Sequence, residues 1–356
     1  MRFQFLLRNP SSGEAMEVVD ASSRSLDYQL NGVHTATITV PLTSSTAGFI
    51  APGQTRLEVW RTVGDGTNQM VFWGEVPSSA VMMNAADDKM TAVFKDPRWR
   101  WEHMYTTMFG AGVPWEVSDF IWQLVVEWDD TNYWTIWPCG QGYMATGLMQ
   151  VLDSTTIEKF SDRIGALTTH VDGPDVDVSF GTGAPLLDIW GRMGSAKPDA
   201  VFRYGFAADG STLDSNVRDL SVTYTDPFNS INTSWTDSVT GQGKSTLWDP
   251  NLEAGAIYGS LQKMVVVSES VTDSQALFIH EGAKGALVLP RMIIEVKGLT
   301  YDAPEPFNDF YLGDTVFLTA GKGALRVDGA GLRIHGIHID VDQEGNPQTD
   351  VTVAEV

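Results

Sequence analysis

The sequence holds a single cysteine, Cys139, among 356 residues. One thiol excludes an intrachain disulfide and a cysteine-based zinc cluster, so stability has to come from packing. Basic residues are also few, since 23 Lys and Arg stand against 45 Asp and Glu and give a net charge of -22. Such a charge argues against binding a nucleic acid backbone or an anionic membrane through a basic face.

Long apolar runs are missing as well. The apolar stretches fall short of the roughly 18 residues that a membrane-spanning helix requires. Residues 1–10 lack the long apolar segment and the cleavage site of a signal peptide. We therefore expect synthesis in the cytoplasm and no direct membrane insertion. With 43% hydrophobic and 19% charged residues, the chain can bury sizeable cores, and its length predicts two to four domains.

Short alternating strands dominate residues 1–103. Apolar and polar residues alternate over residues 35–40 and 56–59, another strand is predicted over residues 70–76, and residues 84–88 separate two more. Many short strands at this spacing predict an antiparallel barrel or sandwich.

The middle of the chain, residues 104–288, mixes helices with strands. Apolar residues recur at helical spacing, or follow a capping pattern, in four places: residues 117–128, 155–167, the segment after Pro185, and residues 272–286. We expect an α+β region here, with two subdomains.

Strands return in residues 289–356. Their alternation slips by one residue near His335 and Gly336, which predicts a β-bulge there. Residues 342–346 predict a hairpin turn. The expected strands are residues 291–297, 314–320, 332–341 and 349–355.

The two ends of the chain resemble each other. Residues 50–59 run parallel to residues 310–319, because each segment carries a turn glycine that leads into an alternating strand and, later, to a second glycine on a strand. The two glycine pairs are Gly53 with Gly74 and Gly313 with Gly336. We interpret this pattern as a duplicated small barrel, with one copy at each end.

One glycine-rich segment, residues 241–246, resembles the end of a phosphate-binding loop. The first required glycine is replaced by Ser238, and Trp248-Asp249-Pro250 interrupts the helix that should follow. A flexible polar loop is the better interpretation, and no nucleotide cofactor is expected.

Two acidic segments resemble cation loops. Residues 340–345 open like a calcium loop, but Val351 replaces the bidentate glutamate, which favours a hairpin turn. Asp172, Asp175 and Asp177 form a second acidic loop, for which calcium binding stays open because no further ligand can be named.

Catalytic and metal-ligating patterns find little support. The six histidines include no metalloprotease motif, although His335 and His338 lie three residues apart. Cys139 follows Trp137-Pro138 without a nearby histidine, which is typical of an incidental thiol. We therefore expect no catalytic residues, no metal and no cofactor.

Tryptophan is concentrated in residues 115–137, together with the acidic residues Glu127, Asp129 and Asp130. Aromatic rings beside carboxylates suit glycan binding, since rings stack on sugar faces and acids bond hydroxyls. The same residues also suit a core or a subunit interface. The five tryptophans are Trp115, Trp122, Trp128, Trp134 and Trp137.

Both ends of the sequence resemble siphophage minor tail proteins of the central tail-tip hub type, which are similar to the baseplate hubs of contractile tails. The resemblance covers about the outer half of the chain. At the beginning it is carried by Leu30-Asn31-Gly32, Pro41, Pro52-Gly53, Phe72-Trp73-Gly74 and Lys95-Asp96-Pro97. At the end it is carried by residues 289–297, Phe307, Phe310, Gly313-Asp314, Val316, Arg333, Gly336, Ile339-Asp340, Asp342 and Gly345.

The resemblance implies a mainly β chain with an α+β middle and two tube-protein-like antiparallel β-barrels, one in residues 1–103 and one in residues 289–356. It implies a virion protein of the tail tip: a homotrimer that presents six similar barrels to the six-fold tail tube. It also implies contacts with the distal tail protein, the tape-measure protein and other minor tail proteins, and a channel that DNA passes without specific binding. Because the sequence stops at Val356, we expect any enzymatic module to be a separate protein.

Three classes of function remain, in this order: a structural hub without enzymatic activity, a glycan-binding adhesin of the tail tip that uses residues 115–137, and a cell-wall hydrolase. The duplicated barrel favours the first class, the tryptophans allow the second, and only scattered acids support the third.

Overall fold

The computed structural model describes residues 2–9, 12–64, 66–105, 114–132, 142–143, 146–151, 159–168, 173–180, 185–207, 209–225, 230–248, 262–287 and 292–355. Strands far outnumber helices in these residues, and the longer helices lie in the middle of the chain. The predicted mainly β fold with an α+β middle is therefore confirmed. No helix in the described ranges is long and apolar enough to cross a membrane.

An N-terminal half is built from antiparallel strands paired in the order β3-β4-β8-β6-β5-β1-β2, with β7 also paired to β8. The alternation in β4 places Ala36, Ile38 and Val40 in the core. The elements are β1 (Arg2–Arg8), β2 (Ala15–Val18), β3 (Ser23–Gln29), β4 (Thr35–Pro41), α1 (Ser45–Phe49), β5 (Arg56–Thr62), β6 (Asn68–Glu75), η1 (Ser78–Ala80), β7 (Val81–Asn84), β8 (Lys89–Lys95) and η2 (Pro97–His103).

The first part of the middle carries two helices over two small sheets. The predicted apolar helix face is confirmed, since Val117, Phe120, Ile121 and Leu124 of α2 are buried. Glu116 accepts a hydrogen bond from the Asp119 N–H and caps this helix. The elements are β9 (Pro114–Glu116), α2 (Val117–Asn132), β10 (Gly142–Tyr143), β11 (Met149–Val151), α3 (Phe160–Thr168), β12 (Asp175–Phe180) and β13 (Pro185–Trp190).

The helix predicted after Pro185 is wrong, because these residues form the strand β13. The apolar residues fit both periods over so short a run. The antiparallel ladder with β12 decides for the strand, since it buries Leu187 and Ile189 on one face together with Val176 and Val178.

The second part of the middle is a three-stranded sheet covered on one face by a helix. Its elements are β16 (Ser230–Asp237), β17 (Gly243–Trp248), β18 (Gln262–Val271) and α5 (Asp273–Leu287). The predicted helix over residues 272–286 is confirmed. Two bonds hold it on the sheet: His280 Nδ1 lies 2.9 Å from Thr233 Oγ1, and Trp235 Nε1 donates to Asp273.

A C-terminal half completes the fold, with strands paired in the order β14-β20-β21-β22-β19-β15. Two of its strands come from the middle of the sequence. The predicted bulge is confirmed, because the register of β21 against β22 shifts between Ile334 and Gly336. The elements are β14 (Ala196–Gly205), β15 (Val217–Tyr224), β19 (Met292–Leu299), β20 (Thr315–Lys322), β21 (Leu325–Val341) and β22 (Pro347–Glu355).

The two halves share one topology. Strands of the first half have counterparts in the second half that take the same places in the pairing. In order along the chain, the counterparts are β1 and β14, β3 and β15, β4 and β19, β5 and β20, β6 with β7 and β21, and β8 and β22. Only the first pair differs in direction, since β1 is antiparallel to β5 whereas β14 is parallel to β20. The turn glycines seen in the sequence are equivalent too, because Gly53 and Gly313 both have positive φ and both lead into the fourth strand of the series.

In each half the short segment that precedes the second strand of the series bonds to the first strand. In the first half the Val19 N–H donates to the Phe5 carbonyl, and in the second the Asn216 N–H donates to the Arg203 carbonyl.

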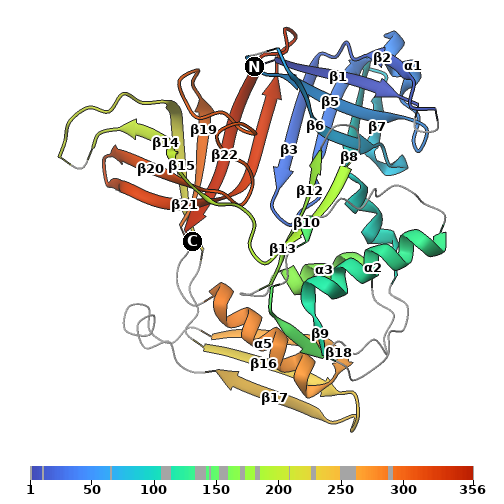
Figure 1. Cartoon of the computed structure of the whole chain (residues 1–356), viewed down its shortest axis with the longest axis vertical. Coiled ribbons are helices and arrows are strands. Elements are labelled where there is room, and N and C mark those ends of the chain that lie inside the picture. The colour runs from blue at the N-terminus through green and yellow to red at the C-terminus, as the bar shows by residue number, and fades with distance from the viewer. Residues whose placement is uncertain are drawn as a thin grey trace.

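The pairing of β3 with β21 joins the halves into one continuous sheet. In Figure 1 the blue N-terminal half and the red C-terminal half lie side by side, and the helices α2, α3 and α5 lie below them. The strand β12 lies between the halves and carries the polar contacts described next.

Candidate functional site: a polar junction of three chain segments

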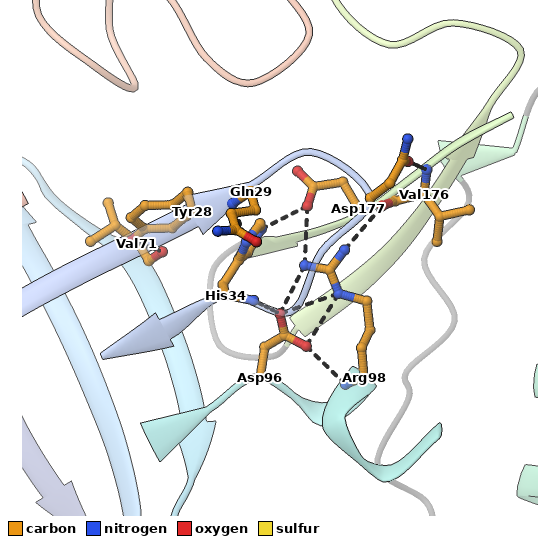
Figure 2. Close-up of polar contacts among 9 residues, drawn as sticks. Tyr28, Gln29, His34, Val71, Asp96, Arg98, Val176 and Asp177 are labelled. Atoms are coloured by element: carbon orange, nitrogen blue, oxygen red, sulfur yellow. Dashed lines mark hydrogen bonds and ion pairs between the residues drawn. The ribbon is translucent and has the colours of Figure 1, made fainter. Parts of the chain in front are cut away.

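A buried cluster of four charged or ionisable side chains links the N-terminal half to β12. His34 Nε2 lies 2.6 Å from Asp177 Oδ1, and Arg98 lies between Asp96, at 2.8 Å, and Asp177, at 3.3 Å. All four side chains are 2% exposed or less. Figure 2 shows them pointing toward one another from the loop before β4, the start of η2 and β12.

Asp96 is placed by the local chain. It caps η2 by accepting the Arg98 N–H at 2.8 Å, and its second oxygen accepts the His34 N–H at 2.6 Å. Pro97 follows at the first helical position, where its missing N–H costs nothing. The segment Lys95-Asp96-Pro97 is thus a cap that also fixes the loop carrying His34.

The buried carboxylate of Asp177 is stabilised by its neighbours. Burial alone raises the pKa of the Asp177 carboxyl, but His34 and Arg98 beside it outweigh burial and hold the pKa below its usual range. Burial likewise works against the charge on Arg98, while Asp96 and Asp177 raise the pKa of its guanidinium. Paired charges of this kind tolerate burial, whereas either partner left alone would be costly.

Main-chain groups of β12 complete the same junction. Arg98 donates to the Val176 carbonyl at 3.0 Å, and the Val176 N–H donates to the Asn31 side chain at 2.7 Å. Asn31 has a positive φ of 62°, a conformation that asparagine tolerates better than most residues. The segment Leu30-Asn31-Gly32 therefore helps to hold β12 in place through the side chain of Asn31.

A second cluster joins β12 to the C-terminal half. Asp175, which is buried, accepts hydrogen bonds from Arg333 of β21, from the Met193 N–H at 2.6 Å and from Asn31 at 3.3 Å. Arg333 also donates to the carbonyls of Gly313, at 3.2 Å, and Met193, at 3.1 Å. Asp175 thus bonds to both halves, whereas Asp177 pairs with the N-terminal half.

Aromatic contacts reinforce the seam between the halves directly. The ring of Tyr28 on β3 packs edge-on against Phe307, with centroids 5.1 Å apart, and its hydroxyl donates to the Val71 carbonyl at 2.9 Å. Arg61 of β5 donates to the carbonyls of Pro306 and Phe307 at 3.0 and 2.8 Å. The halves are therefore held by side-chain contacts as well as by the β3–β21 ladder.

The buried histidine–aspartate pair resembles a catalytic pair in composition only. His34 Nδ1 accepts the Gln29 N–H, so Nε2 carries the proton toward Asp177, and both side chains are fully buried. A substrate cannot reach atoms in this position. The cluster fixes the relative placement of three chain segments, which is a structural role.

Sequence reasoning did not single out His34, Arg98 and Arg333 as a site. The turn motifs that carry the family resemblance could have pointed to these residues. Asn31, Asp96, Gly313 and Arg333 belong to those motifs, and all four contribute to the two clusters.

The predicted tryptophan segment is described only in part. Trp115 and Trp122 are half-buried and pack against the core, and the Trp115 ring lies 6.3 Å from that of Phe120. The Trp128 side chain, Trp134 and Trp137 lie outside the described residues. Glycan binding by this segment stays a prediction.

The remaining sequence motifs have ordinary partners where they are described. Asp342 caps its own turn by accepting the N–H groups of Glu344 and Asn346 at 2.9 and 2.8 Å. Lys244 bonds to Asp273 at 2.7 Å within the three-stranded sheet and its helix. Among the described residues, no group of three or more His, Cys, Asp or Glu side chains is placed to hold a metal. Cys139 and Asp172 lie outside them.

Comparison with known proteins gives matches among solved structures. No family model matches the chain, and no curated protein matches it. The tail protein from Neisseria meningitidis MC58 is similar with a TM-score of 0.59 and 13% identity, over 100% of this chain and 97% of that one. The 43 kDa tail protein of prophage MuSo2 from Shewanella oneidensis gives a TM-score of 0.55 and 12% identity, over 99% and 98%. Prophage tail protein gp18 from Listeria monocytogenes EGD-e gives 0.53 and 10%, over 99% and 94%.

The chain therefore has the fold of phage tail proteins, over practically its whole described length. The resemblance that the turn glycines and strand patterns indicated is confirmed at the level of the fold.

Proposed function

We propose that this chain is a structural subunit of a bacteriophage tail tip: a trimeric hub that joins the six-fold tail tube to a three-fold tip. One observation carries the proposal. The chain contains two halves of the same strand topology, side by side in one sheet, within the fold of phage tail proteins. Three copies offer six similar halves, the number that a six-fold tube requires.

The polar junction supports a role that depends on rigid geometry. Asp177 ties β12 to the N-terminal half and Asp175 ties it to both halves, so buried ion pairs hold the halves in a fixed arrangement. A ring in which all six halves are equivalent requires the same angle between every two successive halves. The fixed junction is therefore what a ring subunit needs, and it offers no accessible catalytic group.

The partners and the channel follow from the same proposal. The hub would contact the distal tail protein, the tape-measure protein and other minor tail proteins in the virion. With a net charge of -22, carboxylates that face the channel would repel passing DNA within a Debye length of about 8 Å. Reversing the charge of such acids to lysine should slow DNA ejection.

The test is the mass of the purified protein by light scattering, followed by cryo-electron microscopy of the particle. A mass of three times 39.0 kDa, and a three-fold ring with two like halves per chain, are the expected results. A monomer at every concentration, together with selective binding on a glycan array, would favour the adhesin that uses residues 115–137 instead.

A further inference from the structure

Strands β7 and β15 each have one unpaired edge among the described residues, and they lie at opposite sides of the molecule. Strand β7 pairs with β8 and β15 pairs with β19, and in the described part of the chain neither has a partner on its other edge. Figure 1 shows β15 on the left and β7 on the right of the view. Open edges present free N–H and C=O groups, which makes them templates for pairing with another chain.

The internal symmetry of the chain assigns a partner to each of these edges. Strand β7, which continues β6, has the place in the first half that β21 has in the second. Strand β15 has the place in the second half that β3 has in the first. Inside the chain, β21 and β3 pair antiparallel, with Gly336 to Val341 opposite Gln29 to Arg24. The unpaired edges of β7 and β15 therefore correspond to the edges through which β21 and β3 pair inside the chain.

Exposed apolar side chains lie at both free edges. On β7 the side chains of Met82 and Met83 are 63% and 65% exposed, and on β15 Tyr224 is 63% exposed. Large apolar residues on an open strand edge favour association, because they are removed from water when a partner strand is added.

The charges at the two edges repeat those of the internal junction. Arg24, the second residue of β3, donates to the Gln343 carbonyl in the acidic turn that follows β21 and lies near Asp342. Arg218 is the second residue of β15 and is exposed. The turn that follows β7 carries Asp87, also exposed, and Asp88. The same basic side chain and acidic turn are thus present on the free edges.

We infer that β7 of one copy pairs antiparallel with β15 of the next copy, and that Arg218 faces the turn containing Asp87 across this interface. This inference rests on the proposed trimeric hub and specifies how its copies join. The contact is heterologous, so it repeats head to tail, and three copies close into a ring when six such steps, three inside chains and three between chains, complete one turn about a common axis. Neighbouring halves in the ring are then joined by equivalent strand pairs: β21 with β3 inside a chain, and β7 with β15 between chains.

The test is a charge swap read out by light scattering over a dilution series. Arg218→Glu places three carboxylates together at each interface and should raise the dissociation constant of the trimer by at least about tenfold. Arg218→Glu combined with Asp87→Arg should restore most of the lost affinity. Arg192→Glu, an exposed change of equal charge in the middle of the chain, is the matched control and should leave the trimer intact.

Amide hydrogen exchange on the wild-type protein provides a second readout that requires no variant. Residues 81–84 and 217–224 should exchange more slowly in the trimer than in the diluted monomer. If the wild type forms a trimer but Arg218→Glu behaves like Arg192→Glu and these amides gain no protection, the interface is wrong while the hub stands. A wild type that is monomeric at every concentration would overturn both.

Discussion

His338 of β21 and Asp27 of β3 lie opposite each other in the strand pair that joins the two halves, with His338 Nδ1 2.5 Å from Asp27 Oδ1. The hydrogen bond to Asp27 is the main cause that raises the pKa of His338 to about 9. The charges of Asp27 and Asp340 add to it, and partial burial opposes it. The seam between the halves therefore contains a titratable ion pair.

This pair predicts a loss of stability at alkaline pH. The folded pKa of His338 lies above the roughly 6.5 of an unfolded chain. Its contribution is therefore fully present below about pH 6.5 and is lost as the pH rises through about 9. Because the two side chains are 39% and 43% exposed, we expect about 1 kcal/mol or less. Urea unfolding between pH 6 and pH 10 should show a smaller loss for His338→Gln than for the wild type; equal losses would contradict the assignment.

Removal of the buried cation should be costly. Arg98→Met leaves the carboxylates of Asp96 and Asp177 buried without their main counter-charge, and we expect a loss of about 3–5 kcal/mol in the free energy of unfolding. Urea denaturation measures it. Arg192→Met, at an exposed position, serves as the control and should change stability by about 0.5 kcal/mol or less. A similar small change for Arg98→Met would show that the cluster does not hold the junction.

Asp175 and Arg333 should be energetically coupled. A double-mutant cycle with Asp175→Asn and Arg333→Met should give a coupling energy of about 0.5–3 kcal/mol, because the two side chains bond directly across the junction. A coupling near zero would mean that Arg333 is held by the carbonyls of Gly313 and Met193 alone.

Two glycines of similar conformation should respond differently to alanine. Gly194 and Gly210 have φ of 87° and 84°, so each substitution costs about 1–2 kcal/mol for the left-handed backbone. At Gly194 an added Cβ would lie 2.2 Å from the Gly313 carbonyl carbon, whereas nothing lies within 4 Å at Gly210. We expect Gly194→Ala to be more destabilising by a further 1–3 kcal/mol or so. Equal thermal unfolding midpoints for the two variants would refute the close approach of these segments.

Local sequence patterns predicted many helices and strands correctly. They failed where the same residues satisfy both the helical and the strand period. The alternation in β4, the apolar face of α2, the bulge at Gly336 and the helix α5 all follow from residues within a few positions of each other. The strand β13 was predicted as a helix because six residues with Leu186, Leu187 and Trp190 satisfy a helical period as well. Only its ladder with β12 selects the strand.

The candidate site could likewise be predicted only in part from the sequence. The sequence grouped Asp175 and Asp177 with Asp172 in an acidic loop, for which calcium binding stayed open. Their actual partners, His34, Arg98 and Arg333, are separated from them by tens to more than a hundred residues. No local period or spacing connects such positions.

The sequence alone determined the strand-rich composition, the turn glycines that lead into equivalent strands at both ends, and the acidic charge, because each depends on short-range conformational preference or on residue counts. Only the tertiary structure decided that β14 and β15 from the middle complete the C-terminal half, that β3 and β21 join the halves, and that β12 is held between them by buried ion pairs. These features depend on contacts between distant segments, where the burial of many side chains outweighs the preference of any one of them.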